Sequence, residues 1–375
     1  MRNLRDKIRI LYVITGLTAG GAELNLSKLI NNLDQNHFES HVCSLTNTKD
    51  ILPLIIDKIS SIFLLNATKS SQFIRIAFQV RKIIKKVDPD IIHCIMFHSN
   101  MIGRFAAFNL NKIVISSIRT KLKHKKLGNL FDFLTQPLVN YYFVNSKSLL
   151  NFISHYGIQK NKIHLMENGI NFELFNPNKS KEEIKNELGL ANVPIICTVA
   201  NFKKQKDYPT IIKAMNLLKN KMEFCYLIAG SGLQFEDNSV EIKELVEHYA
   251  LSNVKFLGFR NDVANILSIS DVWVNSSIFE GQSNSLLEAM AMKLPIITTD
   301  IDENREIVRH NQEAILIPIQ SPHVLAKSIE SLLKNKQFAE DLANRAFLRV
   351  KKNYDNRYHM HKMMNFYDKI CLNIT

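Results

Sequence analysis

Two carboxylates, Glu280 and Glu288, lie around a predicted strand-to-helix turn and could together bind a polar ligand. The segment reads as a buried strand over 272–274, a polar loop, a helix over 284–293 and a second apolar strand over 295–298. This is the βαβ pattern of a parallel sheet. Ligands bind at the carboxyl edge of such sheets, where the free N–H groups of a helix start favour phosphate. A loop acid and an acid in the first helical turn could therefore hold a nucleotide sugar.

A purely structural interpretation of one of these acids competes with the binding interpretation. Ser285 and Glu288 have the spacing of a capping box, in which Glu288 would only accept a hydrogen bond from the Ser285 N–H group. Glu280 has no such structural explanation, because a loop acid beside glycine caps nothing. The other motifs decide between the two interpretations of Glu288.

The stretch from Glu280 to Glu288 resembles the retaining glycosyltransferases of family 4, which have the GT-B fold. Members carry two glutamates separated by seven residues and followed by Ala-Met-Ala, as at 289–291 here. By this resemblance Glu288 would hold the ribose hydroxyls of a nucleotide sugar, and Glu280 would hold the hydroxyls of the donor sugar. The residues between them would meet the sugar and diphosphate, partly through backbone N–H groups: Gly281, Gln282, Ser283, Asn284, Ser285 and Leu286.

Length and composition indicate an ordinary two-domain globular protein. The chain has 375 residues, of which 46% are hydrophobic and 22% charged. No apolar run approaches the roughly 18 to 20 residues of a membrane span. The apolar stretch over 10–14 is too short for a signal peptide and lacks a cleavage site, so it predicts a first strand. Five scattered cysteines without a Cys-x-x-Cys motif suit a reducing cytoplasm and argue against disulfides and zinc.

The positive charge is concentrated in the first half of the chain. The net charge is +13, and residues 1–176 hold 23 Lys and Arg against 11 Asp and Glu. A basic face suits nucleic acid, an anionic membrane or an acidic substrate, while a solvated lysine-rich surface is the alternative. Nucleic acid is disfavoured because no aromatic repeat or known binding module accompanies the charge.

Two strand-to-helix turns of the first half could contact a ligand. A strand over 8–15 leads to Gly20 and Gly21, which permit close approach to an anion although they match neither a dinucleotide fingerprint nor a Walker loop. In the family a glycine pair at this place faces the donor phosphates. His98 opens a later helix and could touch the acceptor or the donor sugar, although a lone histidine at a helix start is more often a cap or surface residue.

Two basic segments follow in the first half. The helix predicted over 70–87 has an apolar side, and we expect that side to pack on the sheet. The less favoured alternative is that this helix lies on a membrane. After the strand over 113–117, many family members have a histidine that is missing here. Arg119 becomes a candidate for contacting an anionic acceptor or the leaving diphosphate. Cations at this strand end could grip lipid headgroups or a lipid pyrophosphate, unless they belong to a mobile solvated loop: Arg119, Lys121, Lys123, Lys125 and Lys126.

The second half carries further residues that the resemblance assigns to the donor. After the strand over 194–199 the family usually has an arginine and a lysine for the diphosphate. Here Asn201 takes the arginine position and Lys206 keeps the lysine, and Lys203 or Lys204 could compensate for the missing arginine. The later strand ends would seat the nucleoside, through Gly230, Gly232, Phe259 and Arg260. Asp300 and Asp302 match the metal motif of a different transferase fold, which we interpret as coincidence, and no metal or other cofactor is expected.

The sequence thus predicts an α/β protein with the GT-B fold, in which two Rossmann-like domains face a cleft and the last helix crosses back to the first domain. We expect an acceptor-binding domain over 1–180, a nucleotide-sugar-binding domain over 181–355 and the crossing helix over 356–375.

The expected reaction is the metal-independent transfer of a sugar, with retention of the anomeric configuration, to a hydroxyl of a glycan or lipid-linked acceptor. The expected donor is a nucleoside diphosphate sugar, with UDP as the preferred nucleotide. Glu280, Lys206, His98 and Arg119 are the catalytic candidates. The expected place is the cytoplasm, at the inner face of the plasma membrane, and the alternative activities are those of a nucleotide-sugar epimerase or a sugar phosphorylase.

Overall fold

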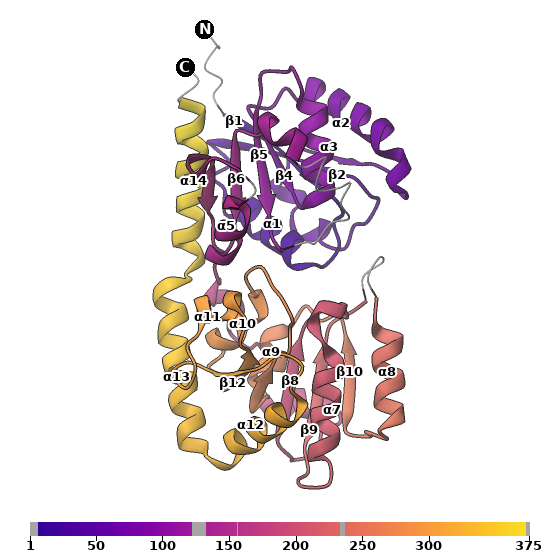
Figure 1. Cartoon of the computed structure of the whole chain (residues 1–375), viewed down its shortest axis with the longest axis vertical. Helices are drawn as coiled ribbons and strands as arrows, with labels where there is room; N and C mark the ends of the chain where they lie inside the picture. Colours follow the sequence, from indigo (N-terminus) through magenta and orange to yellow (C-terminus); the bar gives the residue numbers. More distant parts are fainter. Residues whose placement is uncertain (1–6, 122–132, 156, 233–236, 373–375) are drawn as a thin grey trace. The chain divides into compact units, whose positions relative to one another are not determined.

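The computed structural model describes residues 7–121, 133–155, 157–232 and 237–372, which form two compact units (Figure 1). The first unit runs to Asn168 and takes up the chain again from Arg357, and the second comprises Gly169–Asn356. Each unit consists of a parallel sheet covered by helices, so the predicted α/β fold with two Rossmann-like domains is confirmed.

The sheet of the first unit contains seven parallel strands in the order β3-β2-β1-β4-β5-β6-β7. The strands are β1 (Ile8–Ile14), β2 (Phe38–Ser44), β3 (Ser61–Leu64), β4 (Ile91–Ile95), β5 (Ile113–Ile118), β6 (Tyr141–Val144) and β7 (Ile163–Leu165). The order reverses between β1 and β4, which pair in register from Ile10 with Ile91 to Ile14 with Ile95. The carboxyl ends of these two strands therefore open at the switch point of the sheet, where doubly wound folds bind ligands.

Helices cover both faces of this sheet because alternate strand residues point to opposite sides. The helices of the first unit are α1 (Gly21–Asn32), α2 (Phe73–Val87), α3 (Phe97–Ala107), α5 (Lys147–Ser154) and α14 (Asn356–Leu372). Tyr12 of β1 lies in a core with α1 and α14, whereas Val13 lies in a core with α2 and α3. The last helix, which follows the entire second unit in sequence, therefore completes one face of the first unit.

A buried polar contact fixes α14 on its face of the sheet. His93 of β4 is fully buried, and its Nδ1 lies 2.7 Å from the hydroxyl of Tyr367 in α14. The Nε2 atom of His93 lies 2.7 Å from the hydroxyl of Ser117 on β5. Burial, helped by the charge of Arg119, lowers the pKa of His93 to about 3, so the ring is neutral.

The sheet of the second unit contains six parallel strands in the order β10-β9-β8-β11-β12-β13. They are β8 (Ile195–Val199), β9 (Cys225–Ala229), β10 (Val254–Gly258), β11 (Val272–Val274), β12 (Ile296–Thr299) and β13 (Ile315–Ile317). Here the order reverses between β8 and β11, which pair at Ile196 with Val272 and at Cys197 with Trp273. The loops that follow β8 and β11 thus meet at the switch point of this sheet.

Two apolar cores enclose this second sheet. The helices of this unit are α6 (Lys181–Glu187), α7 (Tyr208–Leu218), α8 (Ser239–His248), α9 (Val263–Ser268), α10 (Asn284–Ala291), α11 (Asp302–Ile307), α12 (Pro322–Lys334) and α13 (Lys336–Asn353). Val272 and Val274 pack on one side with α7, α8 and α12, and Trp273 packs on the other side with α9, α10 and α13.

The predicted elements around the two glutamates match the structure closely, with one correction. The strand over 272–274 is β11, and the predicted helix begins at Asn284 but ends at Ala291. The N-cap of this helix is Ser283, whose hydroxyl accepts from the Leu286 N–H group. The capping-box interpretation of Ser285 and Glu288 is therefore wrong, as is the expectation that Glu288 lies in the first turn.

No helix among the described residues has the length and hydropathy to cross a bilayer. α2, the candidate for lying on a membrane, packs one apolar face on the sheet, while Ile74 and Phe78 of the same helix are exposed.

Candidate functional site

The loops that follow β8 and β11 are joined by backbone contacts at the switch point of the second sheet. The Ile278 N–H group donates to the carbonyl of Gln205 at 2.8 Å. The Ser276 hydroxyl lies 2.9 Å from the Lys206 carbonyl and 2.8 Å from the Asp207 carbonyl. These contacts hold the two loops side by side, so that their side chains can interact.

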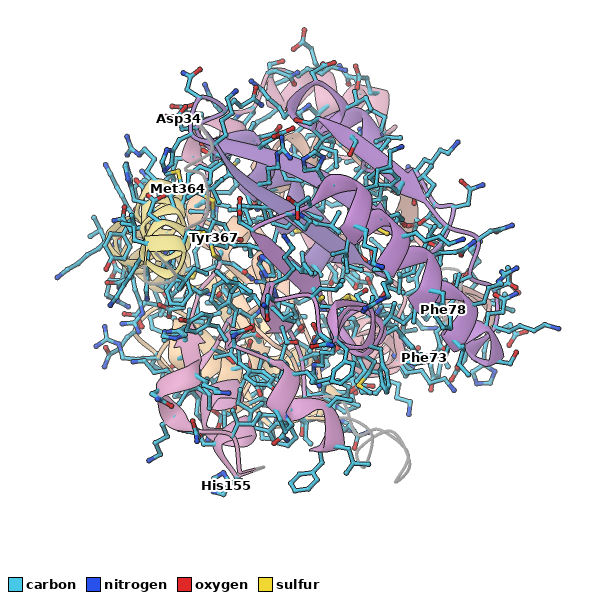
Figure 2. All side chains as sticks on the ribbon, turned by 90° about the horizontal axis from the view of Figure 1, so that it is seen from above. Asp34, Phe73, Phe78, His155, Met364 and Tyr367 are labelled. Carbon is cyan, nitrogen blue, oxygen red and sulfur yellow. The ribbon has the colours of Figure 1, made fainter. Side chains whose placement is uncertain are left out.

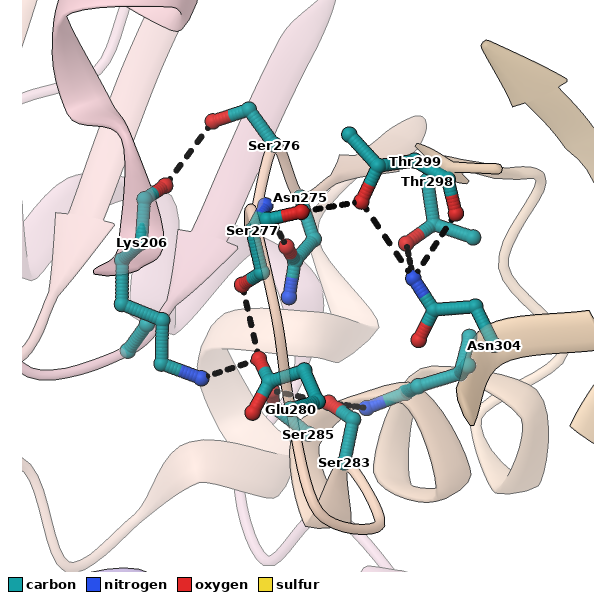
Figure 3. A network of polar contacts seen from close by, with 12 residues as sticks. Lys206, Asn275, Ser276, Ser277, Glu280, Ser283, Ser285, Thr298, Thr299 and Asn304 are labelled. Atoms are coloured by element: carbon teal, nitrogen blue, oxygen red, sulfur yellow. Dashed lines mark hydrogen bonds and ion pairs between the residues drawn. The ribbon is translucent and has the colours of Figure 1, made fainter. Parts of the chain in front are cut away.

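Lys206 and Glu280 form an ion pair across these loops (Figure 3). The Lys206 Nζ donates to Glu280 Oε1 at 2.5 Å, and the two side chains are only 15% and 7% exposed. The hydroxyl of Ser277 donates to the same oxygen at 2.7 Å. The structure thus brings together, at the carboxyl edge of the second sheet, two predicted catalytic residues that lie far apart in sequence.

A buried polar network holds the Glu280 loop in place. The Ser277 N–H group donates to Asn275 Oδ1 at 2.7 Å, and the Ser277 carbonyl accepts from Thr299 Oγ1 at 2.6 Å. The Asn304 amide in α11 donates to Thr298 Oγ1 at 2.8 Å and to the Thr299 carbonyl at 2.9 Å. Because all five of these residues are buried, the network connects the loop to the end of β12 and to α11 with little freedom to move.

The sequence pattern did not lead us to these supporting residues. Polar side chains follow directly after the buried strand β11 as Asn275, Ser276 and Ser277, and two threonines end β12. Polar residues at buried strand ends need hydrogen-bond partners. The sequence pattern therefore indicates hydrogen-bonded side chains at these strand ends, namely Asn275, Ser277, Thr298 and Thr299.

The start of α10 holds the remaining predicted donor-binding residues of this stretch. Gly281, Gln282 and Ser283 are buried in the turn that leads from Glu280 into the helix. Ser285 and Leu286 lie in the first turn, and Glu288 follows in the second turn with a half-buried side chain. Glu280 thus precedes the start of α10 and Glu288 follows it, so both glutamates and the N-terminal N–H groups belong to one short segment.

The neighbouring strand end brings a glycine close to the β8 loop. A Cβ atom at Gly230 would lie 1.9 Å from the Ala200 carbonyl oxygen, so only glycine fits beside Ala200 and Asn201. A Cβ atom at Gly232 would lie 2.0 Å from the carboxylate of Asp237. Gly230 and Asn201 are therefore adjacent to each other at this edge.

Phe259 and Arg260 follow β10, the outer strand of the sheet. Phe259 is exposed, and Arg260 is paired with Asp262 through two contacts of 2.7 and 2.6 Å. Hydrogen bonds and charge from Arg260 lower the pKa of Asp262 although burial opposes them. The arginine charge is thus already balanced within its own loop.

The two aspartates of the metal motif are also engaged by an arginine. Arg305 donates to both oxygens of Asp300, at 2.6 and 2.8 Å, and its Nη1 lies 3.5 Å from Asp302 Oδ1. Within the described ranges, no group of three or more His, Cys, Asp and Glu side chains could hold a metal ion.

In the first unit, Gly20 and His98 lie at the switch point between β1 and β4. Gly20 is the N-cap of α1, and Gly21 is its first residue. The hydroxyl of Thr15, the residue after β1, lies 3.1 Å from the hydroxyl of Ser99 in α3. His98 lies beside Ser99 with an exposed side chain, after Met96, whose φ of 73° is strained for a residue with a side chain.

Arg119 is more constrained than a loop cation. Its guanidinium donates to Asn168 Oδ1 at 2.9 Å, and burial lowers its pKa to about 10. It stays charged at neutral pH because that value is still far above 7. Lys121 is half-buried, whereas Lys123, Lys125 and Lys126 lie outside the described residues.

Two doubly wound parallel sheets, one with a Lys–Glu pair at its switch point, define this chain as a GT-B type α/β protein. Residues 180–349 match the family model for glycosyl transferases group 1, and residues 19–174 match that for glycosyltransferase family 4. The chain belongs to the group 1 glycosyl transferases, and the predicted resemblance to family 4 glycosyltransferases of the GT-B fold is confirmed.

Named relatives and a solved structure agree with this assignment. The chain is 24% identical over 315 residues to N,N'-diacetylbacillosaminyl-diphospho-undecaprenol alpha-1,3-N-acetylgalactosaminyltransferase of Campylobacter jejuni, covering 79% of this chain and 81% of the relative. It is 24% identical over 338 residues to UDP-Gal:alpha-D-GlcNAc-diphosphoundecaprenol alpha-1,3-galactosyltransferase of Escherichia coli, covering 85% and 86%. The crystal structure of Anabaena Alr3699/HepE in complex with UDP and glucose superposes with a TM-score of 0.87 at 16% identity, covering 96% of this chain and 100% of that chain.

Proposed function

We propose that this glycosyltransferase moves a sugar from a UDP-sugar to a hydroxyl of a lipid-linked acceptor during synthesis of a cell-surface glycan such as lipopolysaccharide, O-antigen or capsule. The transfer retains the anomeric configuration and needs no metal ion. The names of the Campylobacter and Escherichia relatives include a diphospho-undecaprenol acceptor, and the Anabaena protein was solved with UDP. These names support the donor and acceptor classes.

The observation that carries the proposal is the ion pair between Lys206 and Glu280 at the switch point. A nucleoside diphosphate sugar offers a substitute for each partner. Its diphosphate oxygens can accept hydrogen bonds from the Lys206 ammonium group in place of Glu280, and its sugar hydroxyls can donate to the Glu280 carboxylate in place of Lys206. Donor binding would therefore open the pair without leaving either charge buried and uncompensated.

The same exchange would place a positive charge where the reaction creates a negative one. During transfer the bond from the sugar carbon to the diphosphate breaks, a bond to the acceptor oxygen forms, and the acceptor proton is released. Lys206 and the N–H groups at the start of α10 would stabilise the charge that grows on the diphosphate. Glu280 would steady the sugar, with Glu288 on the ribose, and no side chain is assigned as a nucleophile.

The basic first unit would receive the acceptor. A lipid-linked acceptor resides in a membrane with an anionic cytoplasmic surface, which attracts Lys and Arg. We therefore propose peripheral association with that surface, with Arg119, Lys121 and the lysines at 123, 125 and 126 near the acceptor headgroup.

Nucleotide binding to the purified protein tests the proposal most directly. The melting temperature is measured with UDP, GDP, ADP and their sugars, with and without Mg²⁺, because a ligand that binds the folded state stabilises it by RT ln(1 + [L]/Kd). We expect a shift of equal size with and without Mg²⁺ for UDP and one UDP-sugar. Lys206→Ala and Glu288→Ala should both lose it.

Lys204→Ala is the matched control, because Lys204 is an exposed lysine in the same turn. It should keep the full shift. A shift that survives in Lys206→Ala, or that requires Mg²⁺, would contradict the proposed site. Turnover without an acceptor alcohol would indicate an epimerase, and dependence on inorganic phosphate would indicate a phosphorylase.

A further inference from the structure

An apolar ridge on the first unit is exposed although the same two helices bury their other faces in the core. Ile74 and Phe78 of α2 are 69% and 64% exposed, and Phe105 and Phe108 at the end of α3 are 39% and 59% exposed. By contrast, Ile76 and Val80 of α2 are completely buried against the sheet. The helix thus has two apolar faces, and only one of them is explained by the fold.

The four exposed side chains come from two helices, α2 and α3, that pack side by side. The rings of Phe73 and Phe105 stack edge to face, with centroids 5.3 Å apart. Arg81 of α2 donates to the carbonyl of Ala106 at 3.0 Å and to that of Phe108 at 2.6 Å. Phe73 and Phe78 are seen together on α2 at one edge of the first unit (Figure 2). We call Ile74, Phe78, Phe105 and Phe108 the α2–α3 ridge.

The charges around the α2–α3 ridge have one sign. The exposed cations of α2 are Arg75, Lys82, Lys85 and Lys86. Neither α2 nor α3 contains an aspartate or glutamate. The first acid after α2, Asp88, lies 2.5 Å from Lys112 and is neutralised there. The ridge is therefore flanked by four cations without an acid on its own helices.

We propose that the α2–α3 ridge docks this protein on an anionic lipid surface, an inference that rests on the proposed transfer to a lipid-linked acceptor. Aromatic and aliphatic side chains flanked by lysines match the boundary between acyl chains and anionic headgroups. A second copy of the chain fits poorly, because a two-fold contact through this ridge would set its lysines against the same lysines.

Vesicle binding by the full chain tests the docking. Sedimentation with phosphatidylcholine vesicles, with and without phosphatidylglycerol, is compared for the wild type, Ile74→Ser/Phe78→Ser and Lys82→Gln/Lys85→Gln. Each basic residue near an anionic surface contributes about 1 kcal/mol, so loss of two lysines should weaken partition roughly 20-fold or more. The serine variant should lose binding to a similar extent. Val240→Ser/Leu348→Ser, which removes side chains that are 67% and 65% exposed in the second unit, should bind as the wild type does.

The outcomes separate this inference from the proposed reaction. Ridge variants should keep the UDP-induced melting shift and transfer to a short-chain, water-soluble acceptor, which also shows that they are folded. The inference is overturned if both ridge variants bind vesicles like the wild type, or if only neutralising the lysines at 121–126 abolishes binding. It is also overturned if the wild type forms a dimer that the ridge variants lose. Failure of the proposed reaction would instead leave vesicle binding intact while UDP gave no shift.

Discussion

Replacing Glu280 by alanine leaves the Lys206 ammonium group without its counterion in a site largely closed to water. Removing one partner of a buried ion pair costs about 3 to 5 kcal/mol. Because the Lys206 side chain is 15% exposed, we expect a cost at the lower end of this range, about 3 kcal/mol. For a domain of this size each kcal/mol lowers the melting temperature by about 2 to 4 °C, which predicts a loss of roughly 6 to 12 °C.

A double-mutant cycle measures this interaction in the absence of nucleotide. Lys206→Ala alone should also destabilise, because Glu280 then lies buried with the Ser277 hydroxyl as its one remaining partner among the residues that the structure describes. The double variant removes both charges and should cost about 3 kcal/mol rather than the sum of about 6, a coupling of about 3 kcal/mol. Urea unfolding monitored by fluorescence and circular dichroism gives the four free energies.

An exposed pair of almost the same length is the matched control. Lys179 and Glu187 lie 2.6 Å apart, but their side chains are 41% and 51% exposed. Water screens this pair, so the corresponding cycle should give a coupling below about 1 kcal/mol. If the Lys206–Glu280 cycle gave an equally small value, the ion pair would not form in solution, and the exchange proposed for donor binding would have no basis.

Three further predictions follow from the hydrogen-bond networks. The pKa of His93 is about 3 in the folded protein against its ordinary 6.5, so the stability that neutral His93 contributes is complete above pH 6.5 and is lost as the pH falls towards 3. The free energy of unfolding should therefore fall by about 1.4 kcal/mol per pH unit in this range. The variant His93→Gln should reduce that slope. Tyr367→Phe leaves His93 Nδ1 buried without its partner and should cost about 1 to 3 kcal/mol in urea unfolding, whereas Tyr358→Phe, at an exposed tyrosine of the same helix, should cost less than about 0.5 kcal/mol. Ser277→Ala removes the hydroxyl that donates to Glu280 and should lower kcat about fivefold, corresponding to about 1 kcal/mol, with the UDP-induced melting shift preserved; an unchanged kcat would mean that Ser277 does not position Glu280.

The sequence predicted the elements around the site because their periodicity is strong. The apolar run that became β11 and the amphipathic stretch that became α10 start where the pattern indicated. Local capping was harder to predict. Ser283 and Ser285 have the same chemistry, and only the backbone conformation of the preceding loop decides that Ser283 caps the helix. The error for Glu288 follows from this two-residue ambiguity.

The contacts that position the site required the folded chain. Lys206 and Glu280 meet because β8 and β11 are neighbours, and no local pattern specifies that two strands separated by β9 and β10 in sequence lie side by side. Arg119 illustrates the converse. In sequence it heads a run of cations that we expected to be exposed, yet the fold half-buries it beside Asn168, which comes from a distant segment.

The position of α14 in the first unit constrains the order in which the chain folds as it is synthesised. Residues 169–356 form a contiguous unit and can fold when they leave the ribosome, but the first unit lacks part of its core until residues from Arg357 onward have emerged. Until then Tyr12 and Ile14 lack the α14 side chains of their core, and His93 lacks the Tyr367 hydroxyl. The nascent first unit thus exposes apolar surface for the whole time needed to translate the second, which is the interval when chaperones would be needed and when truncated chains would aggregate.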